Sequence, residues 1–145
     1  MRASSRQWSL TLAALAALVG CYSSPAPQAG TVAEETAKQF YEALVRKDLP
    51  HAYALLDPAS RNHYSEQQFK DLAHRQLDAW GFEPRKVYVR ACEEHGTEAV
   101  AHIVVTCQAA SPQQFYKDAV VLRRDVSGWG IILSPRFGQR TDRQP

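Results

Sequence analysis

The chain has 145 residues, close to the size of one typical domain. Lys and Arg together number 17 and Asp and Glu 15, for a formal net charge of +2. The two surplus positive charges, Arg2 and Arg6, stand at the N-terminus, so the rest of the chain is balanced. A nucleic-acid-binding protein needs a clustered basic face, and this balance counts against that class. With 45% hydrophobic residues, the chain is too apolar to be disordered.

The first twenty residues have the pattern of a secretory signal peptide. Arg2 and Arg6 precede an uncharged run from Trp8 to Val19 that is mostly Leu and Ala. A membrane-spanning helix needs about 20 apolar residues, so this run is too short to span. A positive start, a short apolar core and a small residue at Gly20 predict a signal peptide over residues 1–20.

The end of that segment, Leu18-Val19-Gly20-Cys21, resembles the bacterial lipobox. In lipoproteins with this motif the signal is cut before the cysteine, which then carries two or three acyl chains such as palmitate. Several acyl chains on one residue give stable membrane anchoring, where a single chain would be marginal. The resemblance implies lipidation at Cys21; the alternative is an ordinary signal peptide followed by an unrelated cysteine.

Residues 21–30 are small, polar and proline-containing, which is typical of a flexible tether. Residue 22 is Tyr rather than Asp. By resemblance to the sorting pattern of Gram-negative lipoproteins, this residue implies the outer membrane, facing the periplasm, if the source has one. We therefore expect a protein of the cell envelope that is attached to the membrane through its N-terminal lipid.

Three amphipathic helices are expected next. Thr31 and Glu34 form a capping box, and apolar residues at three- and four-residue spacing predict a helix over 32–46. Asp48 is the predicted N-cap of a second helix, which Asp57 and the proline after it would end. A third helix is predicted between a capping box at Ser65 and a C-terminal glycine, Gly81. The aromatic stripe of these helices is expected in the core: Phe40, Tyr41, Tyr53, Phe69 and Trp80.

The second half of the sequence changes to a strand-like period. Strands are predicted over 86–91, 99–107, 118–124 and 129–133, with short turns between the first two and the last two. Strands joined by such turns are antiparallel. Helices followed by a meander predict an α+β domain over 31–135, with the helices packed on the concave face of one curved sheet. The last segment, 136–145, is expected to be disordered.

Several of these positions resemble the nuclear transport factor 2-like superfamily. The matching residues are Phe40-Tyr41-x-Ala43-Leu44, Asp48, Ala52-Tyr53, Leu55-Leu56 and the late Gly128-Trp129-Gly130-Ile131. The resemblance implies a cone-shaped domain over residues 31–134. Because the superfamily includes isomerases, dehydratases, non-catalytic binding domains and small lipoproteins, the fold alone does not imply a function.

The chain lacks the sequence fingerprints of cofactor and metal enzymes. It contains no phosphate-binding glycine loop with lysine, no HExxH and no CxxC, so no cofactor is predicted. Cys92, His95, His102 and Cys107 are ligand types that zinc prefers. If Gly96 is the hairpin tip, however, the two cysteines lie roughly 25 Å apart at about 3.3 Å per residue, which argues against a metal site.

The same separation weakens a disulfide between Cys92 and Cys107, which requires Cα atoms within about 7 Å. An oxidising compartment would favour the bond, since two thiols remain once Cys21 is lipidated. We expect two unpaired, mostly buried thiols, and a disulfide is the alternative that a different strand register would allow.

The candidate pocket residues are Tyr41, Tyr53, Tyr88, His102 and Tyr116. Enzymes of the resembling superfamily place an Asp or His inside the cone as general base, beside a Tyr or Asp. His102 shares strand parity with Val100 and Val104, and either face of that strand could line the cone. No carboxylate occupies an alternating apolar position in 86–91, 99–107 or 119–122, so no catalytic residue is assigned.

These observations favour a lipid-anchored, non-catalytic envelope protein that binds a small apolar ligand or a protein partner. One alternative is an isomerase or hydrolyase using His102 in the cone. Another is an interaction module that forms a homodimer through the open face of the sheet.

Replacement of the lipobox cysteine tests the anchoring. Cys21→Ser should move the protein from the membrane fraction to the soluble periplasmic fraction without unfolding the domain, because the acyl chains are the predicted attachment. Fractionation and immunoblotting measure the distribution. A wild-type protein that is already soluble, or that keeps residues 1–20, would contradict the prediction.

Overall fold

The computed structural model describes residues 30–107 and 114–139. The predicted signal peptide, Cys21, most of the tether and the last six residues lie outside the described residues. In the described part, four helices precede four strands. They are α1 (Val32–Val45), α2 (Leu49–Ala54), α3 (Pro58–His63), α4 (Glu66–Trp80), β1 (Lys86–His95), β2 (Glu98–Thr106), β3 (Phe115–Asp125) and β4 (Gly128–Ile132).

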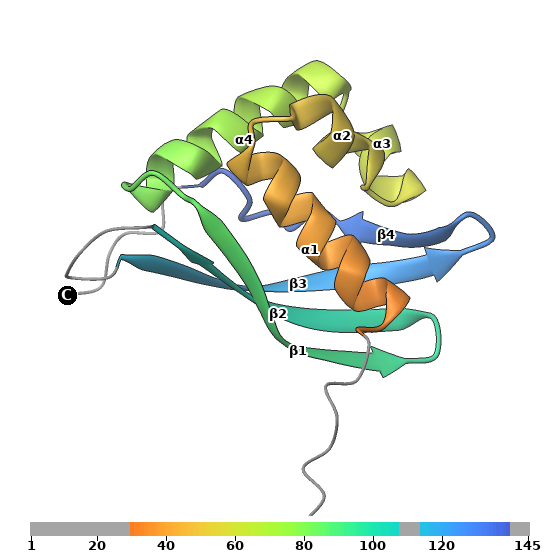
Figure 1. Cartoon of the computed structure of the whole chain (residues 1–145). Coiled ribbons are helices and arrows are strands. Elements are labelled where there is room, and N and C mark those ends of the chain that lie inside the picture. The colour runs from red at the N-terminus through yellow and green to blue at the C-terminus, as the bar shows by residue number, and fades with distance from the viewer. Residues whose placement is uncertain (1–29, 108–113, 140–145) are drawn as a thin grey trace, which may run out of the picture.

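The strands form one curved antiparallel sheet in the order β1-β2-β3-β4, and all the helices lie on one side of it (Figure 1). The predicted α+β class and the antiparallel meander are therefore confirmed. Helix α1 crosses the concave side and contacts all four strands. Helix α4 lies farther from the sheet than α1 does (Figure 1).

The alternation of buried residues identifies the inner face of the sheet. On β2, Ala99, Ala101, Ile103 and Val105 are buried, while His102 between them is exposed. Phe40 of α1 packs against this interior and against the rings of Phe69, Tyr41 and Phe137. The predicted aromatic stripe is thus part of the core, because the amphipathic faces of α1 and α4 are turned toward each other and toward the sheet.

The helical half contains one element that the sequence analysis does not predict. Asp57 and Pro58 were expected to end the second helix, but they also begin α3. The Asp57 carboxylate accepts from the N–H of Ser60 at 2.9 Å, and Pro58 occupies the first helical turn, where a missing N–H costs no hydrogen bond. The same two residues can stop one helix and start the next.

Two predicted boundaries change in the second half. Strand β3 begins at Phe115, not at residue 118. The folded part also continues past residue 135, because Phe137 is buried against Phe40 and Phe69. At Gly138, a Cβ would lie 2.5 Å from the carbonyl oxygen of Leu72, so only glycine allows this close approach to α4. The expectation of disorder from residue 136 onward is therefore wrong for 136–139.

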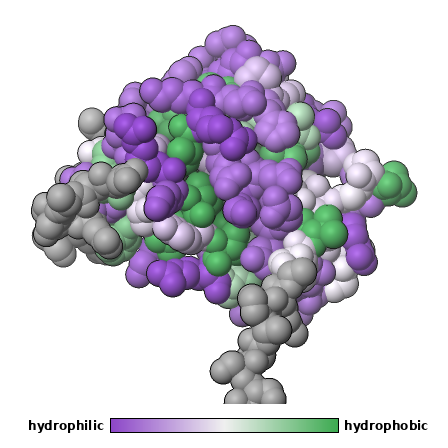
Figure 2. Space-filling model, in the orientation of Figure 1, coloured by the Kyte–Doolittle hydropathy of each residue, from purple (hydrophilic) through white to green (hydrophobic). Residues whose placement is uncertain are grey.

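The surface over α4 and the other helices is largely hydrophilic, and hydrophobic patches appear between the helical layer and the sheet (Figure 2). None of the helices in the described residues has the length and apolar character that a membrane crossing requires.

Truncation of the central aromatic residue tests the core assignment. Phe40→Ala should lower the free energy of unfolding by about 3–5 kcal/mol, the usual cost of removing a large buried aromatic side chain. Val32→Ala, in the same helix but 71% exposed, should change it by less than about 0.5 kcal/mol. Urea denaturation measures both, and similar losses for the two variants would contradict this packing.

Candidate functional site

The edge of β3 is open along half of its length. Strand β4 pairs with β3 only from Val121 to Asp125. Beyond Ile132 the chain leaves the sheet and turns toward α1 and α4, where Phe137 packs. The segment from Phe115 to Val120 therefore has no strand on this side among the described residues, and a cavity opens in the gap.

The cavity has a volume of about 240 Å³ and reaches the interior of the cone. The described residues that line it are mainly apolar, and Asp118 is the one charged residue among them. The lining includes Phe40, Tyr41, Val120, Ile131, Leu133 and Phe137. The cavity therefore combines an apolar wall with one polar pole at Asp118.

Three hydrogen bonds converge on the Asp118 carboxylate. The hydroxyl of Tyr41 donates to Oδ2 at 2.5 Å, and the hydroxyl of Tyr116 donates to the same oxygen at 3.2 Å. The backbone N–H of Ala119 donates to Oδ1 at 2.8 Å. Along an antiparallel strand, successive N–H groups point to opposite edges. Since the N–H of Arg124 bonds to Thr97 on the β2 side, that of Ala119 points to the open edge.

Both tyrosines remain protonated well above neutral pH. Burial raises the pKa of Tyr41 well above its usual value, and the negative charge of Asp118 adds to the effect. Burial also raises the pKa of Tyr116, again with a contribution from Asp118. Trp80 packs against the Tyr116 ring, with centroids 5.4 Å apart. The cluster is thus a carboxylate held by two neutral phenols in an apolar setting.

The structure brings together two of the five sequence-predicted pocket residues, Tyr41 and Tyr116. Tyr53 is half-buried and donates to the carbonyl of Tyr64 at 2.9 Å, so its hydroxyl joins α2 to the loop before α4. Tyr88 is 46% exposed. His102 is exposed on the face opposite the helices, and this placement removes it from the interior of the cone.

Asp118 is a site residue that was not predicted from the sequence, and the expectation that no carboxylate occupies an alternating apolar position is wrong. Tyr116, Asp118, Val120 and Leu122 share one face of β3, and the last two are buried. The predicted strand began at Asp118 itself, so its parity with Val120 was not counted. A strand starting at Phe115 would have indicated an aspartate on the inner face.

The two cysteines of the sheet are free and half-buried. Cys92 lies opposite Ala101, six residues before Cys107 along β2, which corresponds to roughly 20 Å at about 3.3 Å per residue. Burial raises the pKa of the Cys92 thiol. Within the described residues no group of three Cys, His, Asp or Glu side chains is arranged to hold a metal ion.

Comparison with solved structures identifies the architecture. A protein from Campylobacter jejuni described as an NTF2-like (nuclear transport factor 2-like) transpeptidase aligns over 72% of this chain and all of its own length, with a TM-score of 0.58 and 12% identity. A ketosteroid isomerase-like protein from Erwinia carotovora atroseptica aligns over 69% of this chain and 88% of its own, with a TM-score of 0.50 and 14% identity. The fold is NTF2-like.

At these identities the similarity concerns the fold alone. No family model matches the sequence, and no curated protein matches it either. The NTF2-like cone therefore explains where the cavity lies, and the chemistry of the site has to be argued from the side chains of this chain.

Tyr41 and Tyr116 make the free energy of unfolding depend on pH in the alkaline range. A tyrosine whose folded pKa is raised binds its proton more tightly in the folded state, so its stabilising effect is present below about pH 10 and is lost as the pH rises further. We expect the free energy of unfolding to fall between pH 10 and 11, by up to about 1.4 kcal/mol per pH unit for each such group. Tyr41→Phe should make this fall shallower.

Urea denaturation at pH 9, 10 and 11 measures the effect. Tyr88→Phe, which removes a hydroxyl on the exposed face, is the matched control. An unchanged pH dependence in Tyr41→Phe would show that this phenol does not titrate with folding.

Proposed function

We propose that this chain is a lipid-anchored envelope protein whose NTF2-like domain is a non-catalytic binding domain for a small, mainly apolar ligand. The ligand occupies the cavity beside Tyr41 and Asp118, and Cys21 attaches the domain to the membrane through the tether of residues 21–30. The observation that carries the binding role is the three-donor hydrogen bonding of Asp118 at the polar end of an apolar cavity.

Because of these hydrogen bonds, the polar end of the cavity can accept a hydrogen bond from a ligand but cannot donate one. An ionised carboxylate only accepts, and each phenol has one proton, which it already gives to Asp118. The lone pairs of the Tyr41 hydroxyl, which lines the cavity, remain for a ligand. The pole therefore suits a ligand that carries a hydroxyl or amine donor, and it discriminates against one that offers only a carbonyl or ether oxygen.

The size of the cavity limits the ligand. Pockets for drug-sized molecules have about 300–1,000 Å³, and this one has about 240 Å³. The apolar lining, which includes Phe40 and Leu133, provides the main driving force by removing apolar surface from water. A ligand of one ring or a short branched chain, with a single donor group, fits these limits.

The alternative function is proton transfer by Asp118, in place of the His102 base. The position of an aspartate in the cone favours it. Two features count against it: Asp118 already accepts three hydrogen bonds, and enolate formation needs free donors aimed at the developing oxyanion. The two phenolic protons, which would be those donors, are engaged by Asp118.

A matched pair of small probes tests the binding role. We expect 4-methylphenol to bind the full chain more tightly than 4-methylanisole, in which a methyl group blocks the hydroxyl donor. Tyr41→Phe should weaken the binding of 4-methylphenol by about two- to tenfold, the usual effect of losing one hydrogen bond. It should change the affinity for 4-methylanisole little. Titration calorimetry or NMR chemical-shift mapping measures both probes.

Tyr88→Phe is again the control, since its hydroxyl lies on the other face of the sheet. Equal affinity for the two probes, or chemical-shift changes that avoid Phe40, Val120 and Leu133, would contradict the proposed site. Isomerisation of an unsaturated ketone by the wild type, abolished in Asp118→Asn, would favour the catalytic alternative instead.

A further inference from the structure

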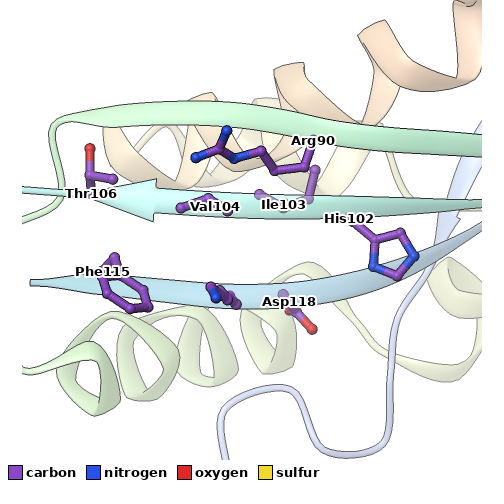
Figure 3. Close-up of a pocket in the computed structure, with 8 residues that line it drawn as sticks. Arg90, His102, Ile103, Val104, Thr106, Phe115 and Asp118 are labelled. Carbon is purple, nitrogen blue, oxygen red and sulfur yellow. The ribbon is translucent and has the colours of Figure 1, made fainter.

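The outer face of the sheet contains a second hollow, distinct from the cavity in the cone. It is a groove of about 560 Å³ that crosses β1, β2 and β3. Figure 3 shows Arg90 on β1, His102 and Thr106 on β2, and Phe115 on β3 around it. Its apolar floor includes Val104 and Phe115, the latter 56% exposed. Nothing in the helical layer covers this face (Figure 1).

Apart from Asp118, the charged side chains that line the groove are positive. Arg90 and Lys117 line it, and Lys86 lies at its end, paired with Thr106 across β1 and β2. Lys117 rests over the Phe115 ring, 5.2 Å from its centroid. Asp118 also borders the groove, but its carboxylate is engaged by Tyr41 and Tyr116 on the inner side. In residues 30–107 and 114–139, none of the three cations has an ion-pair partner.

The opposite end of the same face is neutralised internally. Arg123 there lies 3.5 Å from the carboxylate of Glu98 and 3.9 Å from that of Asp57. Arg123 is thus compensated by carboxylates, whereas Arg90 and Lys117 at the other end of this face have no such partner among the described residues. An anionic partner at the uncompensated end would supply the missing charges.

The spacing of the cations indicates a partner with several negative charges. Lys86 and Arg90 are four residues apart on β1, about 13 Å at 3.3 Å per residue, and Lys117 is two strands away from β1, about 10 Å. One small anion cannot contact all three. An extended polypeptide can, if its carboxylates and its apolar side chains lie on the same face, with carboxylates four residues apart and an apolar residue midway between them to cover Val104 and Phe115.

The chain's own remaining segments do not have this chemistry. Residues 1–29 and 108–113 contain no Asp or Glu, and residues 140–145 contain one Asp and two Arg. A two-fold contact of this groove with a second copy would bring the same cations of both copies together, because such an interface places one patch against itself. The occupant is therefore a different molecule.

From these observations we infer that the groove docks an acidic, apolar-containing segment of a partner protein, through Arg90 and Lys117 and the apolar floor between them. This site is on the opposite face of β3 from the ligand cavity and does not depend on the cavity being occupied. Contacts of this kind are salt-dependent, because exposed charges are screened by ions.

Binding of a defined peptide tests the inference. The probe is a fluorescein-labelled octapeptide with the repeat Glu-Ser-Leu-Ser, in which the glutamates and leucines share one face of the extended chain. It is titrated with the full chain and followed by fluorescence anisotropy. We expect binding that weakens between 0.05 and 0.5 M NaCl, and about tenfold weaker binding of the peptide with glutamine in place of glutamate. Arg90→Glu and Lys117→Glu should each weaken binding by about three- to tenfold.

Arg75→Glu makes the same charge change at an exposed position of α4 and should leave the affinity within about twofold. Equal weakening by Arg75→Glu would overturn the inference, since it would reflect net charge alone. Displacement of the peptide by inorganic phosphate at constant ionic strength would indicate a small-anion site instead. A wild-type dimer that Arg90→Glu dissociates in sedimentation would identify a second copy as the occupant and would also overturn it.

Discussion

The pairing of β4 with only half of β3 is the constraint from which the functional geometry follows. If β4 continued past Ile132, it would pair with the segment from Phe115 to Val120 and close the gap. Because it stops, the chain after it is free to carry Phe137 into the aromatic core, and the N–H of Ala119 loses a strand partner. Asp118 provides the replacement acceptor at this exposed edge.

That replacement explains how the fold tolerates a carboxylate in the cone. A buried charge is costly unless hydrogen bonds compensate it, and Asp118 receives three. Two of them come from tyrosines that themselves need an acceptor. The cluster therefore has a structural function as well as a chemical one: it satisfies every member with neighbours from α1 and β3. The same hydrogen bonds occupy the protons of both phenols.

The parts of this arrangement that could be predicted from the sequence are those set by local chemistry. Thr31, Asp48 and Ser65 act as caps because a hydroxyl or carboxylate three residues before a free N–H satisfies it. Strand β2 could be predicted from its β-branched residues, although not which of its two faces is buried. The inward position of Asp118 could not be predicted from the sequence. The start of β3 depends on its pairing with β2, and no residue near Phe115 indicates where that pairing begins. The sequence also does not show which face of the sheet holds His102, because this depends on which side α1 covers.

Strand β3 separates two kinds of chemistry by its two-residue alternation. Tyr116 and Asp118 point into the cone, where a protonated phenol and a carboxylate meet an apolar wall. Phe115 and Lys117 lie on the outer face, where a cation and an aromatic ring border an open groove. Asp118 borders both hollows, but its carboxylate is engaged by Tyr41 and Tyr116 on the inner side. Lys117 and Tyr41 share no hydrogen-bond or ion-pair partner among the described residues. Changes at Lys117 and at Tyr41 are therefore expected to act independently, as they do for residues that share no partner. The strand thus provides one rigid element that holds an acceptor surface inside and a cationic surface outside.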